Sequence, residues 1–258
     1  MRQEESEAIV LHHLDYNDAD RIVSFFSLEQ GLLKGFAHNA RKSRKRFGSA
    51  LELFAYVHLR WSGKASGDLV SLQDAELIDL HSGVRRDVGA LALASYGCEL
   101  VEALTAEAQS CPEIFHLLRA FLGHLSKAGL SLEARLLFEL RLFSQLGYAP
   151  HFLHCSACNF PLDGDEVAFS ANGGGGLCLE CAPAALPLRV SPMTLGTLGR
   201  CLQAPVTLFE GFRFSERTLQ EAGGVLQDIL RQHLVRPLKS QSFMEQMLAG
   251  KARVKAIR

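Results

Sequence analysis

The chain has 258 residues, 48% of them hydrophobic, which is typical of a globular protein with one large domain or a few small ones. No apolar run reaches the roughly eighteen residues of a membrane span, and the acidic, polar start argues against a signal peptide, so we expect a soluble, cytoplasmic protein. The net charge of −1 excludes a uniformly basic protein, but residues 30–51 carry six cations and no acid, and residues 231–258 carry seven cations and one acid.

Residues 1 to 80 are predicted to form β-structure. The predicted strands cover residues 7–16, 21–31, 31–40, 49–61 and 69–80. In the fourth, apolar residues alternate with polar ones, and the apolar set is Leu51, Leu53, Ala55, Val57, Leu59 and Trp61. Residues 62–68, SGKASGD, predict a flexible turn. Five short strands in so short a segment suit a small closed barrel, which leaves no exposed sheet edge.

From about residue 84 the apolar residues follow helical spacing. The predicted helices cover residues 85–108, 112–129, 132–148, 191–203 and 215–238, and a short helix lies near 241–249. We therefore expect an α+β protein of several domains. Its parts would be a barrel domain (1–80), a helical domain (81–150 and 186–250), an inserted cysteine module (151–185) and a basic tail (251–258).

Four cysteines predict a metal site. Cys155, Cys158, Cys178 and Cys181 form the pattern C-x2-C-x19-C-x2-C. Each Cys-x-x-Cys turn places two sulfur atoms on one side of the backbone, and two turns complete the tetrahedron of thiolates that Zn²⁺ accepts. Four thiolates leave no open position for water, so we expect a structural zinc. Iron is an alternative metal, and the neighbouring His154 is an alternative ligand. The glycines at 173–176 predict a tight turn.

The strongest anion-binding pattern is the basic segment KGFAHNARKSRKRFG at residues 34–48. Its cations are Lys34, Arg41, Lys42, Arg44, Lys45 and Arg46. Cations so closely spaced displace condensed counterions from a phosphate backbone. Phe36 and Phe47 flank the run; they either stack on bases or, as we favour, belong to the barrel core. A five-stranded barrel with such a segment describes an oligonucleotide-binding (OB) fold, and no residue here indicates reading of a particular base.

Three segments together resemble one protein family over nearly the whole chain. They are residues 7–60, which include the Glu-Gln-Gly turn at 29–31 and the run Ala-Arg-Lys-Ser from residue 40, and residues 138–158 and 236–248. In these motifs the chain resembles RecO, the bacterial DNA repair and recombination mediator family of the RecF pathway. The resemblance implies an N-terminal OB-fold domain and a helical domain interrupted by a zinc module.

The resemblance also implies a non-enzymatic function. It implies binding and annealing of single- and double-stranded DNA, work with RecR, and contact with the C-terminal tail of single-stranded DNA-binding protein. Members load RecA onto coated DNA, which implies a place at the nucleoid. The resemblance also implies that residues 41–46 and Arg21 contact phosphates. In the tail-binding region Leu136 and Leu137 stand where an arginine is expected, so the candidate substitutes are Arg135, Arg141 and Lys239.

Two other interpretations remain open from the residues. A zinc-containing OB-fold protein also suits RNA binding or association with the ribosome. A metal-dependent hydrolase or nuclease would need converging carboxylates, and Asp15, Asp18 and Asp20 are close in sequence. Their spacing is more typical of a turn between strands, and no catalytic residue is predicted.

Overall fold

The computed structural model describes residues 3–63, 69–183 and 188–256, with side chains described up to residue 250. Most of the predicted turn at 62–68 and the side chains of the basic tail thus lie outside the described residues. The chain divides into two compact units, residues 1–131 with 238–258, and residues 132–237. None of the described helices is both apolar enough and long enough to span a bilayer.

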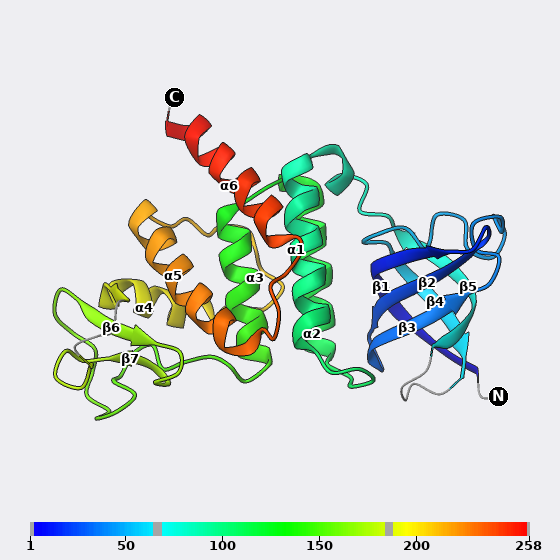
Figure 1. Ribbon diagram of the computed structural model, residues 1–258. Coiled ribbons are helices and arrows are strands. Elements are labelled where there is room, and N and C mark those ends of the chain that lie inside the picture. Colours follow the sequence, from blue (N-terminus) through cyan, green and yellow to red (C-terminus); the bar gives the residue numbers. More distant parts are fainter. Residues whose placement is uncertain (1–2, 64–68, 184–187, 257–258) are drawn as a thin grey trace. The chain divides into compact units, whose positions relative to one another are not determined.

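Five strands form the N-terminal part of the first unit (Figure 1). They are β1 (Gln3–Tyr16), β2 (Asp20–Ser27), β3 (Gly31–Ala37), β4 (Tyr56–Ser62) and β5 (Val70–Asp79). They close into a barrel in the order β1-β2-β3-β5-β4. Neighbouring strands are antiparallel except β3 and β5, which close the barrel as a parallel pair with Gly35 opposite Val70. Together with the helices that follow, this confirms the predicted α+β class.

The barrel core reflects the alternation seen in the sequence, but only over part of the predicted fourth strand. On β4 the side chains of Val57, Leu59 and Trp61 are buried, and the residues between them face outward. Residues 49–55 are turns rather than strand, and Phe54 has a positive φ of 66°. The predicted start at residue 49 was therefore wrong, because this stretch belongs to a connection that packs into the barrel. The residues contributed to the core by that connection include Ala40, Phe47, Ala50 and Leu51.

Three α-helices complete the first unit: α1 (Val88–Leu104), α2 (Pro112–Ala128) and α6 (Gln241–Ala256), with a short 3₁₀ helix η1 (Val84–Arg86) before them. The carboxylate of Asp87 caps α1 by accepting from the N–H of Ala90 at 2.8 Å. The Glu99 carboxylate on α1 accepts from the N–H groups of Lys239 at 2.9 Å and Ser240 at 2.8 Å, just before α6. Helix α6 is longer than predicted, and these hydrogen bonds join its start to α1.

The second unit combines three helices with a small sheet. The helices are α3 (Leu132–Gln145), α4 (Pro192–Cys201) and α5 (Glu216–His233), and the strands are β6 (Val167–Ser170), β7 (Gly175–Leu177) and β8 (Arg189–Val190). Ser191 and Ser215 cap α4 and α5 through their hydroxyl groups. The sheet has the order β7-β6-β8 and was not predicted, because strands of two to four residues are too short to show a period.

Candidate nucleic-acid interface and metal centre

The cationic run lies in the connection between β3 and β4, on a folded segment rather than a free loop. The N–H of Arg41 donates to the carbonyl of Ala19 at 2.9 Å, and the N–H of Phe47 donates to that of Ser43 at 3.3 Å. The side chain of Phe47 is only 3% exposed and packs in the barrel core. The cations are therefore carried on a backbone that the core holds in place.

Within this run the structure separates exposed cations from anchored ones. Lys42, Arg44 and Lys45 are exposed, and none of them forms an ion pair within the described part of the chain. Arg41 lies beside an acid, with its Nε 3.5 Å from the carboxylate of Asp15. Arg46 is anchored: its guanidinium donates to the carbonyl of His38 at 2.6 Å and lies over the ring of Phe47 at 5.0 Å. Three of the predicted cations are thus immediately available to an anion.

The other two predicted cations of the barrel meet acidic side chains. Arg21 on β2 places its Nε 2.8 Å from Asp15 and its Nη1 3.2 Å from Glu52. The hydrogen bond from Arg21 lowers the pKa of Asp15, so this carboxylate stays charged at neutral pH. Lys34 on β3 reaches Glu107 at 2.5 Å. A phosphate group would have to displace these acids, and a role for Arg21 and Lys34 in binding stays a prediction.

An aromatic cluster lies on the outer face of the barrel near the cationic run. The ring of Phe36 meets that of Tyr16 edge-on at 6.0 Å between centroids and stacks on the ring of His38 at 6.4 Å. Tyr16 is 47% exposed and the His38 side chain 78% exposed. Phe36 is half-buried and lies outside the barrel core, so our favoured interpretation holds for Phe47 but is wrong for Phe36. Alternation along β3 would have shown this, because Phe36 shares its outward face with Lys34.

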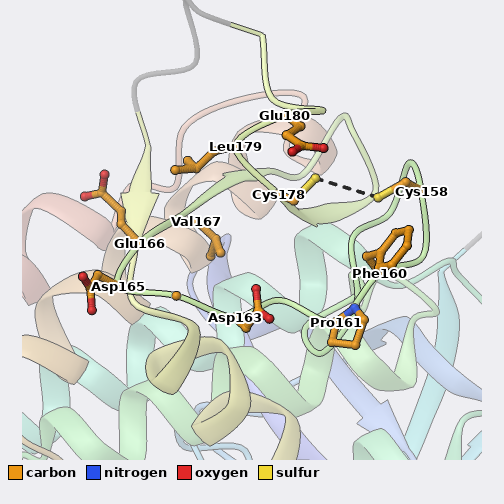
Figure 2. Close-up of a pocket in the computed structure, with 11 residues that line it drawn as sticks. Cys158, Phe160, Pro161, Asp163, Asp165, Glu166, Val167, Cys178, Leu179 and Glu180 are labelled. Carbon is orange, nitrogen blue, oxygen red and sulfur yellow. Dashed lines mark hydrogen bonds between the residues drawn. The ribbon is translucent and has the colours of Figure 1, made fainter.

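The four predicted metal ligands come together in the second unit. All four sulfur atoms lie within 4.8 Å of one another, and all four cysteines are free thiols. Figure 2 shows the Sγ atoms of Cys158 and Cys178 facing each other, 3.8 Å apart. Zn–S bonds of about 2.3 Å in a tetrahedron give an S–S edge of about 3.8 Å. The cluster therefore fits a four-thiolate metal ion.

Backbone hydrogen bonds form the two cysteine turns and join them. In the first turn the N–H of Cys155 donates to the carbonyl of Phe160 at 2.7 Å, and in the second the N–H of Ala182 donates to that of Cys178 at 2.9 Å. The N–H of Ser156 donates to the carbonyl of Gly176 at 2.9 Å, which brings the first turn onto β7, directly before Cys178. The sheet thus positions both pairs of ligands.

Close backbone approach requires a glycine beside the cluster. Gly175 has a φ of 136°, and a Cβ there would lie 2.4 Å from the carbonyl oxygen of His151. Burial opposes ionisation of the Cys155 thiol, but hydrogen bonds from backbone groups, that of Cys158 foremost, lower its pKa to about 6. The hydrogen bond with the Cys178 thiol raises the pKa of Cys181, so the four thiols do not ionise alike and a cation would have to favour the fourfold thiolate form.

The remaining candidate ligands lie elsewhere. His154 is exposed and is not a member of the cysteine group. Throughout the described residues, the four cysteines are the only group of three or more metal-binding side chains whose donor atoms converge, and Asp15, Asp18 and Asp20 do not form such a group.

The three candidates for a partner-binding pocket have different surroundings. Arg135 on α3 forms an ion pair with Glu139 at 2.8 Å. Arg141, also on α3, is only 1% exposed; its guanidinium donates to the carbonyl of Leu208 at 2.6 Å, and burial lowers its pKa. Lys239 belongs to the other unit and has an exposed side chain. Lys239 is thus the most accessible of the three, and Arg141 the least.

Comparison with known proteins places the whole chain in one family. The family profile described as Recombination protein O N terminal matches residues 1–81, and the profile described as Recombination protein O C terminal matches residues 85–242. Curated relatives named DNA repair protein RecO include one from Syntrophotalea carbinolica, 56% identical over 98% of both chains. Another, from Pelobacter propionicus, is 38% identical over 96% of this chain and 98% of its own length. A third, from Geobacter metallireducens, is 34% identical over 96% of this chain and 99% of its own length. This chain belongs to the RecO family of DNA repair and recombination proteins.

Proposed function

We propose that this protein is a DNA-binding recombination mediator rather than an enzyme, and that its N-terminal barrel is an OB fold. The observation that carries the proposal is the exposed set of Lys42, Arg44 and Lys45, which have no acidic partner within the described residues. Unpaired cations on an anchored segment attract a polyanion without first giving up a protein contact. Relatives that match the chain along its length are named DNA repair proteins.

The proposed mechanism is neutralisation of strand charge beside an aromatic surface. Two phosphate backbones repel each other, and cations that contact both lower this repulsion so that complementary bases can meet. The exposed rings of Tyr16 and His38, with Phe36 between them, offer π-faces on which unpaired bases can stack. Both steps are independent of sequence, which suits annealing of any complementary pair of strands.

We further propose that the cysteine cluster holds a structural Zn²⁺. The four thiolates of Cys155, Cys158, Cys178 and Cys181 would saturate the ion and leave it no site for water or substrate. When bound, the metal would join the two turns around β6 and β7. The chemistry that it supplies is therefore a cross-link, and DNA contact falls to the barrel.

The proposed partners are single- and double-stranded DNA, RecR and the tail of single-stranded DNA-binding protein, with loading of RecA as the outcome, at the nucleoid in the cytoplasm. The tail is acidic, so its site needs an accessible cation. Lys239→Gln should weaken binding of an acidic tail peptide if the exposed candidate is used. If binding is lost only on Arg135→Gln, which removes the ion pair between Arg135 and Glu139, the site would be assigned to α3.

The slope of DNA affinity against salt tests the proposal. Replacing Lys42, Arg44 and Lys45 with glutamine removes about three phosphate contacts, and the slope of log K against log salt for single strands should fall by about 2. Arg46 is left in place because its contacts stabilise the segment. A matched control replaces three exposed cations outside both basic stretches, Lys127, Arg200 and Arg213.

Two results would contradict this assignment. The same slope for the triple variant and the wild type would show that DNA binds elsewhere, and an equal loss in the control would show a non-specific charge effect. Competition between DNA and a structured RNA at one salt concentration separates the proposal from the alternative of an RNA-binding or ribosome-associated protein, which requires that RNA win.

A further inference from the structure

The cysteine module carries a concentration of negative charge that DNA binding does not use. Residues 151–185 contain four acidic residues and no lysine or arginine. The four are Asp163, Asp165, Glu166 and Glu180, and all of them line one cavity of about 610 Å³ beside the metal centre. Figure 2 shows them spread around its opening, three on the segment that leads into β6 and one on the second cysteine turn.

These carboxylates form no close ion pairs among the described residues. All four residues are exposed, and none forms an ion pair within the described part of the chain. They are also too dispersed to bind one metal ion together. Among the residues that the structure describes, no three of these carboxylates bring their oxygen atoms as close together as the four cysteines bring their sulfur atoms. Charge spread in this way matches several cations spaced along a chain better than a single divalent ion.

Apolar side chains stand beside the acids. Phe160 is 71% exposed and Leu179 57% exposed, and both line the same cavity. Large apolar groups in the open lose contact with water only when a partner covers them. A cavity of this size falls within the range of roughly 300–1,000 Å³ that accommodates drug-sized ligands, so it can receive several side chains of a peptide.

We propose that this cavity is a docking site for a protein partner, which inserts a basic peptide segment with apolar residues next to its lysines or arginines. Cations of the segment pair with Asp163, Asp165, Glu166 and Glu180, and its apolar residues cover Phe160 and Leu179. A nucleic acid is the wrong class of ligand, because four carboxylates line the cavity and would repel its phosphates, and no lysine or arginine is among the lining residues. The metal-bearing module then serves protein contact, separately from the proposed DNA surface.

The test uses the full-length, metal-loaded protein and a fluorescein-labelled octapeptide with three arginines and two leucines. The test variant carries Asp163→Asn, Asp165→Asn, Glu166→Gln and Glu180→Gln. These changes remove the charge, keep the size, and fall on exposed residues, so folding is preserved. Fluorescence anisotropy at low salt should show peptide binding to the wild type and a loss of affinity of about tenfold or more in the variant. The matched control neutralises Glu76, Glu113, Glu210 and Glu216, which are exposed acids elsewhere.

A second pair of changes tests the apolar part. Phe160→Ala with Leu179→Ala should weaken the leucine-containing peptide several-fold but leave a peptide with glycines in place of leucines unaffected. Equal peptide affinity of the wild type and the test variant would overturn the proposal, as would an equal loss in the control variant. Saturable binding of MgCl₂ that disappears in the test variant would assign the cavity to a cation instead. Binding of single-stranded DNA that falls in the test variant would overturn the assignment to a protein partner.

Discussion

Phe36→Leu should weaken binding of single-stranded DNA by about fivefold to tenfold while leaving the salt dependence unchanged. Stacking on an aromatic ring contributes about 1–3 kcal/mol per base, and each 1.4 kcal/mol is a factor of ten in affinity. Phe36 is half-buried, with the ring of Tyr16 nearly perpendicular to it at 6.0 Å and the ring of His38 nearly parallel to it at 6.4 Å. Only part of the ring is therefore open to a base, which places the expected loss at the lower end of that range.

The assay is a salt titration of affinity for an oligothymidine and for a duplex of the same length. Stacking involves no counterion, so the single-strand plot should shift downward without a change of slope, and duplex affinity should hold because its bases are already stacked. Phe47→Leu is the control for a phenylalanine that lies in the core instead of on the surface. It should lower the free energy of unfolding by about 1 kcal/mol or more, because Phe47 is a core residue. A changed slope, or an equal loss for the duplex, would refute the reasoning.

Three further predictions concern stability. Arg46→Ala should lower the free energy of unfolding by about 1 kcal/mol in a urea titration, because a hydrogen bond and a ring contact are lost, and Lys45→Ala should have no effect. Burial opposes ionisation of Glu99, but hydrogen bonds from Ser240 and Lys239, just before α6, hold its pKa below the ordinary value near 4.5. Its carboxylate thus stabilises the fold above that value and ceases to do so as pH falls through the folded pKa. Glu99→Gln should therefore lower stability at pH 7 and flatten its fall as the pH drops below about 4.5; parallel curves for variant and wild type would contradict this. Cys158→Ser with Cys181→Ser should abolish zinc in the purified protein and lower its melting temperature without changing the salt slope of DNA binding; a folded variant that no longer binds DNA would contradict the structural role of the metal.

The alternation of apolar and polar residues predicted the barrel strands correctly along β4. It placed the start of that strand too early, at residue 49, because the preceding connection also packs apolar side chains into the core. Val57, Leu59 and Trp61 alternate because they face the core from a true strand. Leu51 happens to continue the same phase, yet it enters the core from a turn, and Leu53 is only half-buried. Alternation cannot distinguish these cases, because both place an apolar residue at every second position.

For the candidate sites, the sequence was sufficient where ligands lie in short motifs. The spacing of the four cysteines predicted a cluster that the fold brings together. The sequence also showed where the cations lie, but it did not show which of them are free of protein contacts and so open to a phosphate group. Arg21 meets Glu52, which is distant in sequence, and Arg46 turns back onto a backbone carbonyl. Such pairings depend on how the connection folds over the barrel, and nothing in the local sequence marks them.

The two charged surfaces have different consequences for an approaching polyanion. The cationic run presents Lys42, Arg44 and Lys45 without acidic partners within the described residues, and the cysteine module at 151–185 contains four acids and no lysine or arginine. Salt screens both over a distance of about 10 Å at 0.1 M, so each surface acts locally and the net charge of −1 describes neither. Neutralising the acids should leave DNA affinity unchanged if the strand contacts only the barrel, and raise it if the strand also passes near the cavity. Measuring DNA affinity in both charge variants therefore shows whether DNA contacts the cationic run alone or also passes near the acidic cavity.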